Sequence, residues 1–288
     1  MIILEFLKTI LIGIIEGITE WLPVSSTGHM IIVDELIRLN ITEAFKELFF
    51  VVIQLGAILA VLVLYFDKLN PFSAKKSYLQ KKNTWVLWSK VIVGALPAAV
   101  IGLFLDDFLS AHLYGYITVA IALVAYGVLF ILIEKWREGK PYRVNTVDDI
   151  SYTDALLIGG FQVLSLIPGT SRSGSTILGG MSVGVSRAAS SEFSFFLAIP
   201  IMLGASLLKV VKFAYSYVSS PIPELYIPEG QMGAYIAILA VGIIVSFVVS
   251  LFAIKFLVDF VKRHSFAPFG VYRIILGIVV VAYFLIRG

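Results

Sequence analysis

Six long apolar stretches constrain what this chain can fold into more than any other feature. They are residues 48–66, 85–105, 113–133, 193–208, 230–254 and 266–286. Lys90 and Arg273 are the only charged residues within them. A helix needs about 20 apolar residues to cross the hydrocarbon core of a bilayer, and only 14% of this chain is charged, against about 25% in soluble domains. The sequence therefore predicts an all-α integral membrane protein with six transmembrane helices.

Composition excludes several classes of function. The chain has no cysteine, so disulfide and thiolate chemistry are absent. The net charge is +3 and no basic cluster with interleaved aromatic residues occurs, which argues against nucleic acid as a partner. The apolar start carries Glu5 and lacks the positive region of a signal peptide, so we expect it to belong to the mature protein.

The two halves of the chain share a plan. An offset of 146 residues places Gly13 on Gly159 and Ser25 on Ser171, and an offset of 148 places Gly94 on Gly242. Each half begins with two apolar pieces separated by a stretch rich in Pro, Gly, Ser and Thr, and continues with three long apolar runs. We therefore expect one membrane domain of two repeats, residues 1–134 and 154–288, joined by a cytoplasmic loop at 135–153.

The interrupted pieces predict re-entrant hairpins. In the first half, residues 2–20 and 30–39 flank a break at 22–28, and a matching break at 168–174 lies in the second half. Proline and glycine disfavour helix, and irregular backbone at membrane depth is tolerated only where protein or a cavity covers it. Each break is therefore expected at the tip of a helix–loop–helix hairpin that enters and leaves on one side.

Charge bias in the loops predicts the orientation. Segments 67–90 and 135–154 carry six and four Lys or Arg residues, whereas the opposite side carries the acidic residues Asp106, Asp107, Glu224 and Glu229. By the positive-inside rule the basic segments are cytoplasmic. Three crossings per half invert the second repeat, and six crossings place both termini and the first hairpin mouth outside. Inverted repeats are common in transporters, so a lipid-phosphate transporter or flippase is the alternative function.

The first break follows two carboxylates. Residues 16–29 read EGITEWLPVSSTGH, so Glu16 and Glu20 share one face of a helix. Carboxylates deep in a membrane are costly, and a hard divalent cation such as Mg²⁺ or Ca²⁺ would compensate them, with phosphate oxygens completing its shell. A structural polar pair is the alternative. Ser25, Ser26 and Thr27 lie close to His29, and a serine beside a base is an activated nucleophile, although each hydroxyl could also simply cap a helix.

The second break is suited to binding an oxyanion. Residues 168–176 read PGTSRSGST. Small residues, hydroxyls and an arginine at a helix start form a cradle for phosphate, and arginine offers a two-pronged fork that lysine lacks. Arg172 could instead only neutralise the carboxylates. The halves differ in chemistry, since Glu16 aligns with Gln162 and Ser26 with Arg172, which favours a differentiated active site over a symmetric transporter.

Both motifs resemble those of the bacterial undecaprenyl-diphosphate phosphatases, the bacitracin-resistance protein BacA or UppP family. The resemblance extends over essentially the whole chain, including residues 52–57 and 268–273. It implies a hydrolase of the bacterial inner membrane that converts C55 undecaprenyl diphosphate to the monophosphate, recycling the lipid carrier of cell-wall synthesis, with its site open to the periplasm. It also implies roles for a set of matching residues: Glu16, Glu20, Ser26, His29, Ser171, Arg172 and Thr176.

The expected site contains catalytic, metal-binding and substrate-binding residues. The catalytic residues are Ser26, Glu20, His29 and Arg172, and the metal ligands are Glu16 and Glu20. The substrate-binding residues are Ser25, Thr27, Ser171, Ser173, Thr176 and Arg273. Ser26 attacks the terminal phosphorus with His29 or Glu20 as base, or a water attacks directly while Ser26 is only a ligand. Arg273 lies about five residues beyond Pro268, so it either acts in the site or snorkels to the interface. The sequence leaves a homodimer open.

Overall fold

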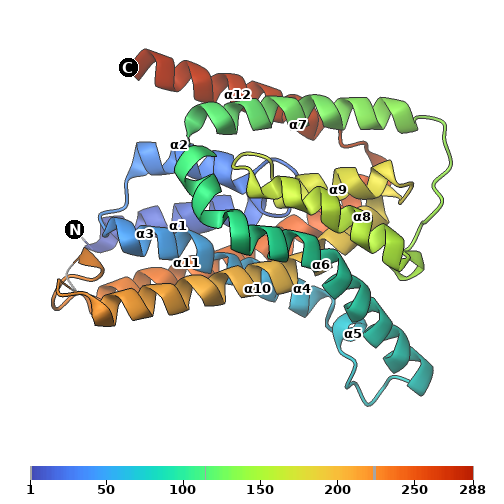
Figure 1. The fold of residues 1–288 in the computed structure, drawn as a ribbon, viewed down its shortest axis with the longest axis horizontal. Helices are drawn as coiled ribbons and strands as arrows, with labels where there is room; N and C mark the ends of the chain where they lie inside the picture. Colours follow the sequence, from blue (N-terminus) through green and yellow to red (C-terminus); the bar gives the residue numbers. More distant parts are fainter. Residues whose placement is uncertain (1, 114, 223–224, 288) are drawn as a thin grey trace.

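Nearly all of the chain is helical. The computed structural model describes residues 2–113, 115–222 and 225–287 (Figure 1). Its α-helices are α1 (Ile2–Thr19), α2 (Ser26–Ile37), α3 (Glu43–Val52), α4 (Gln54–Leu64), α5 (Phe66–Leu69), α6 (Tyr78–Leu113), α7 (Tyr116–Arg137), α8 (Tyr152–Val163), α9 (Arg172–Ser182), α10 (Arg187–Ser219), α11 (Met232–Arg263) and α12 (Ala267–Arg287). Two 3-10 turns, η1 (Val147–Asp149) and η2 (Leu164–Leu166), flank α8. Within these residues the only β contact is an isolated bridge between Val144 and Val185.

Six segments are long and apolar enough to cross a membrane. They are Glu43–Leu64, Tyr78–Leu105, Tyr116–Arg137, Arg187–Ser219, Met232–Arg263 and Ala267–Ile286. Two of them run through internal prolines, Pro97 in α6 and Pro200 in α10, because membrane helices tolerate proline where neighbouring groups satisfy the freed carbonyls. The predicted all-α membrane fold with six transmembrane helices is confirmed.

Two pairs of shorter helices, α1–α2 and α8–α9, occupy the positions of the predicted hairpins (Figure 1). Their outgoing helices begin at Ser26 and Arg172, so residues expected in the loops lie instead in the first turn of a helix. The reason is a pair of matching caps. The hydroxyls of Ser25 and Ser171 accept the backbone N–H groups of residues 28 and 174, each at 3.1 Å, which satisfies donors that a helix start otherwise leaves free. Re-entrant insertion of the pairs stays a prediction.

The helices of the two halves pack across each other in matched pairs. α1 lies against α11, α8 against α6, and α7 against α12. Glycine allows the close approach: a Cβ on Gly159 would lie 2.1 Å from the carbonyl oxygen of Gly94, and one on Gly13 would lie 3.1 Å from that of Gly242. These are the glycines that the two sequence offsets align. The matched contacts support the inverted repeat within one membrane domain, which stays a prediction.

The two ends of the molecule differ in their connections. Both termini lie at one end with the α10–α11 connection, whereas the α5–α6 and α7–α8 connections lie at the other end (Figure 1). The basic segments 67–90 and 135–154 thus share one end of the helices. Glu224 and the side chains of Asp106 and Asp107 lie outside what the structure describes.

Asp154 holds the start of α8 at the basic end. Its carboxylate accepts the N–H of Ser151 at 3.0 Å, the Ser151 hydroxyl accepts the N–H of Asp154 at 3.1 Å, and Arg143 donates to the same carboxylate. Burial raises the pKa of Asp154, but the hydrogen bonds from Ser151 and Arg143 more than offset it, so the pKa lies below its ordinary value. The stability that this produces is complete above the unfolded pKa and is lost as pH falls through the folded pKa.

Asp154→Asn is therefore expected to lower the free energy of unfolding at pH 7 by about 1 kcal/mol, the usual cost of a lost cap. The difference from the unsubstituted protein should shrink as pH falls below about 4, near the unfolded pKa of an aspartate. Thermal unfolding in detergent at pH 7 and pH 3.5 measures both effects. Asp259→Asn, at a side chain that is 78% exposed, serves as the control. If Asp154→Asn were destabilised by the same amount at pH 7 and at pH 3.5, the result would contradict the expectation.

Candidate functional site

The two loops touch each other inside the helix assembly. The hydroxyl of Ser173, in the first turn of α9, donates to the backbone carbonyl of Glu20 at 3.0 Å and lies 3.3 Å from that of Leu22. Both carbonyls belong to the loop between α1 and α2, 153 and 151 residues earlier in the chain. The first-half and second-half motifs therefore form one site.

Glu20 is the centre of this site. The Ser26 hydroxyl donates to its Oε2 at 2.9 Å, and the Arg172 Nε donates to its Oε1 at 3.1 Å. The carboxylate and the guanidinium are both largely buried, with 7% and 10% of their side chains exposed. Trp21 packs its ring against the guanidinium, whose carbon lies 5.6 Å from the ring centroid. Three of the predicted catalytic residues are thus joined in a row, Ser26 to Glu20 to Arg172.

Arg172 is oriented by a residue that sequence reasoning missed. Its Nη1 donates to the carbonyl oxygen of Ser194 in α10 at 2.8 Å, and the hydroxyl of Thr176 lies 2.6 Å from the Ser194 hydroxyl. Thr176 is fully buried behind this contact, so its hydroxyl binds α10 and is not exposed to a ligand. The Arg172 Nη2 finds no hydrogen-bond partner within the described part of the chain. One arm of the guanidinium therefore remains available to an anionic ligand.

Glu16 lies one helical turn before Glu20 and is 1% exposed. Among the residues that the structure describes, its Oε1 has no hydrogen-bond partner. A buried carboxylate oxygen without a donor is costly, and a cation would relieve that cost. No group of three His, Cys, Asp or Glu residues in the described ranges could enclose a metal ion. The donors fit a Mg²⁺-like ion bound by one or two carboxylates and completed by phosphate and water.

Ser25 and Ser171 hold unusual backbone angles at the starts of α2 and α9. Their φ values are +74° and +73°, a left-handed region that non-glycine residues rarely adopt. Such strain is found mostly where a site requires it. Both hydroxyls accept backbone N–H groups as caps. The N-termini of α2 and α9 consequently lie where the two loops meet, and helix N-termini attract anions. Thr27 lies partly buried at the second position of α2.

His29 does not contact Ser26 through either ring nitrogen. Its Nδ1 lies 2.7 Å from the carbonyl oxygen of Ser25, and its Nε2 lies 2.6 Å from the hydroxyl of Tyr272 in α12. Of the two bases that the sequence allowed for Ser26, Glu20 is the one that receives its hydrogen bond.

Arg273 is 0% exposed and does not reach an interface. Its guanidinium donates to the backbone carbonyls of Pro23 at 3.2 Å, Gly169 at 2.9 Å and Thr170 at 2.9 Å. Pro23 lies in the first loop, and the other two lie in the second. The arginine therefore ties the two loops together from α12, with the ring of Tyr126 beneath its guanidinium at 5.5 Å.

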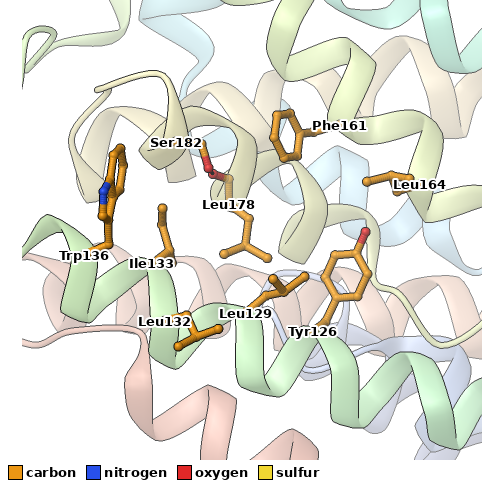
Figure 2. A pocket seen from close by; sticks show the side chains of 9 residues that line it. All are labelled: Tyr126, Leu129, Leu132, Ile133, Trp136, Phe161, Leu164, Leu178 and Ser182. Atoms are coloured by element: carbon orange, nitrogen blue, oxygen red, sulfur yellow. Dashed lines mark hydrogen bonds between the residues drawn. The ribbon is translucent and has the colours of Figure 1, made fainter.

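An apolar cavity of about 230 Å³ lies beside this polar cluster, between α7 and the α8–α9 pair. Figure 2 shows Leu129, Leu132 and Ile133 of α7 facing Leu178 of α9, with Trp136 at one end and Tyr126 at the other. None of the predicted catalytic residues lines it. Tyr126, one of the residues that line the cavity, also belongs to the polar site, because its ring lies beneath Arg273.

These features define a polytopic membrane protein with a buried ionic site between two helix pairs, suited to an anionic ligand. The chain belongs to the family described as bacitracin resistance protein BacA, whose model matches residues 9–279. An Enterococcus faecalis protein named undecaprenyl-diphosphatase is 53% identical over 285 residues, covering 99% of each chain. Proteins of the same name from Desulfitobacterium hafniense and Acetivibrio thermocellus are 52% and 54% identical, the former covering 100% of this chain and 99% of its relative, the latter 98% of both.

Proposed function

We propose that this chain is an undecaprenyl-diphosphate phosphatase, which hydrolyses a C55 polyprenyl diphosphate to the monophosphate and inorganic phosphate. The observation that carries the proposal is the row Ser26–Glu20–Arg172 between the two loops. It combines a nucleophile, a base and a phosphate-binding arginine at two helix N-termini. The names of relatives that are more than half identical over nearly the whole chain support the same substrate.

The contacts suggest the order of events. Ser26 attacks the terminal phosphorus while its proton passes to Glu20, 2.9 Å away. The bond from phosphorus to the bridging oxygen breaks, and the lipid monophosphate leaves. Water then attacks the phosphoserine and passes one proton to an oxygen of the transferred phosphate, while Glu20 returns its proton to the Ser26 oxygen. The bond from phosphorus to the Ser26 oxygen breaks, and phosphate leaves as the dihydrogen phosphate anion. Throughout, the free Nη2 of Arg172 stabilises charge on the transferred group. The isoprenoid tail lies along apolar helix faces outside this cluster.

Glu16 and Glu20 would hold a divalent cation, Mg²⁺ or Ca²⁺, which neutralises phosphate charge when bound. We expect exhaustive chelation to abolish phosphate release and either ion to restore it. Glu16→Gln should weaken binding of the ion at least about tenfold, because one of two carboxylates is lost. Calorimetric titration of the purified protein with Mg²⁺ or Ca²⁺ measures this without turnover, and Glu138→Gln, in an exposed loop, is the control. Full activity after chelation would remove the ion from the mechanism.

A transporter of polyprenyl phosphate is the second candidate, favoured by the matched packing of the two halves. Purified protein in detergent distinguishes the two, because detergent leaves no second compartment. Release of inorganic phosphate from a polyprenyl diphosphate supports the phosphatase. Binding of the lipid without phosphate release supports the transporter and contradicts the phosphatase.

We further propose that the protein lies in the bacterial inner membrane with the basic segments 67–90 and 135–154 in the cytoplasm, both termini outside and the active site facing outward. Carrier lipid left in the outer leaflet after export of its cargo would then reach the site. The chain has no cysteine, so single cysteines can be labelled without background. In intact cells Ser77→Cys should resist a membrane-impermeant thiol reagent and Glu229→Cys should react. The reverse pattern would overturn this orientation.

A further inference from the structure

Both ring nitrogens of His29 are engaged, and α12 supplies one of the partners. The Nε2 lies 2.6 Å from the hydroxyl of Tyr272, and the two rings are nearly parallel, with an interplanar angle of 8° and centroids 5.7 Å apart. The Nδ1 lies 2.7 Å from the carbonyl of Ser25, the residue that caps α2. The imidazole is therefore held from two sides rather than free to rotate.

These partners settle which nitrogen carries the hydrogen. A backbone carbonyl can only accept, so the Nδ1 of His29 must donate to Ser25. A neutral imidazole then has its lone pair on Nε2, and the hydroxyl of Tyr272 donates to it. The carbonyl on Nδ1 selects this tautomer, and the hydroxyl, which can either donate or accept, orients itself to donate to Nε2.

Tyr272 is unusual for a tyrosine on a membrane helix. Its side chain is 45% exposed, and tyrosines of this kind generally turn the hydroxyl toward water or lipid headgroups. Here the hydroxyl turns toward a histidine of the site. The next residue, Arg273, donates to the carbonyl of Pro23 in the first loop. Two successive residues of α12 thus hold the first hairpin at its loop and at its first outgoing turn.

We infer that Tyr272 is a positioning residue of the reaction. Its hydroxyl donates to Nε2 and fixes the ring plane of His29, while the carbonyl of Ser25 holds the hydrogen on Nδ1. The imidazole is thereby presented to the site in one orientation. This inference rests on the proposed phosphatase function for its effect on rate. The contact itself concerns only the folded protein. Where a histidine ligates a metal, loss of the partner that orients its ring commonly costs about 10- to 100-fold in activity, and we expect an effect of that order here.

The test is Tyr272→Phe, which removes one hydroxyl from a half-exposed ring and should leave thermal stability unchanged. The chain has three histidines, so ¹⁵N-histidine NMR of the protein in detergent can resolve His29, assigned by the signals lost in His29→Asn. We expect the unsubstituted protein to show one Nδ1–H tautomer with a hydrogen-bonded Nε2. In Tyr272→Phe the hydrogen-bond shift of Nε2 should disappear, while Nδ1 keeps its hydrogen because the carbonyl of Ser25 is still there to accept it. We expect kcat to fall about tenfold or more and KM to change little.

Tyr215→Phe is the matched control, since Tyr215 lies on α10 and is 73% exposed. It should change neither the His29 signals nor kcat. Unchanged His29 signals in Tyr272→Phe would overturn the inference, and so would changed signals with an unchanged kcat. If the protein released no phosphate from any polyprenyl diphosphate, the proposed function would fail. Loss of the Nε2 hydrogen-bond shift in Tyr272→Phe would still support the positioning of His29 by Tyr272.

Discussion

Ser26→Ala is expected to lower kcat by at least about 10³-fold while the protein remains folded and still binds the diphosphate lipid. Loss of a covalent nucleophile removes the route of the reaction rather than ground-state binding. The structure adds a reason to the sequence argument, because the hydroxyl of Ser26 already donates to Glu20 at 2.9 Å. Alanine leaves Glu20 paired with Arg172, so the architecture of the site should persist.

The measurement is phosphate release together with equilibrium binding of a labelled polyprenyl diphosphate. Ser219→Ala, at an exposed serine near the end of α10, is the control for removal of a hydroxyl. A residual rate above about a tenth of the unsubstituted rate corresponds to a barrier change below roughly 1.4 kcal/mol. Such a result would assign the attack to water and leave Ser26 as a ligand only.

Much of the fold could be predicted from the sequence, because transmembrane helices are specified by length and apolarity alone. The paired breaks at 22–28 and 168–174 also located the two helix pairs. Their detail could not be predicted. Ser25 and Ser171 adopt positive φ values and start a helix immediately afterwards, and helix propensity gives no sign that a run of Ser, Thr and Gly belongs in a first turn. The capping hydroxyls decide the outcome.

The candidate site was predictable where several reactive side chains lie close together in the sequence. Glu20 and Ser26 lie six residues apart, and Arg172 was singled out as the one cation in the second motif. Partners from remote helices were not predictable. Ser194 orients Arg172 from α10, and Tyr272 binds His29 across 243 residues. A single serine among several in α10 carries no signal. Tyr272 stood in the PFGVYR stretch that carried the family resemblance, yet nothing in the sequence pointed to its contact with His29.

Arg273 illustrates how burial changes an interpretation. Its position in the sequence allowed either contact with substrate or snorkelling to the interface. The side chain is fully buried and donates to three loop carbonyls. Those carbonyls belong to both loops, so the arginine has a structural task that neither interpretation included. Its effect on the reaction should then pass through the relative placement of Ser26 and Arg172.

Arg273→Met is accordingly expected to reduce kcat by about 100-fold or more and to destabilise the protein by several kcal/mol. Three buried carbonyls lose their donor, and an unsatisfied buried acceptor costs about 1–3 kcal/mol. Arg273→Lys should also fail, because one ammonium on a flexible stem cannot replace a planar fork that spans both loops. Arg263→Met, at an exposed position, is the control.

The pattern of kinetic change separates two roles for Arg273. A residue that contacts only the substrate would raise KM when it is replaced and leave the melting temperature of the lipid-free protein unchanged. If Arg273 instead ties the loops of α1–α2 and α8–α9 together, replacing it should lower kcat and the melting temperature together. The two loops of the variant would then lose their relative placement even when no lipid is bound. Among the residues that the structure describes, the guanidinium contacts only backbone carbonyls and the ring of Tyr126, so we expect the second pattern. The first would return Arg273 to the substrate-binding residues.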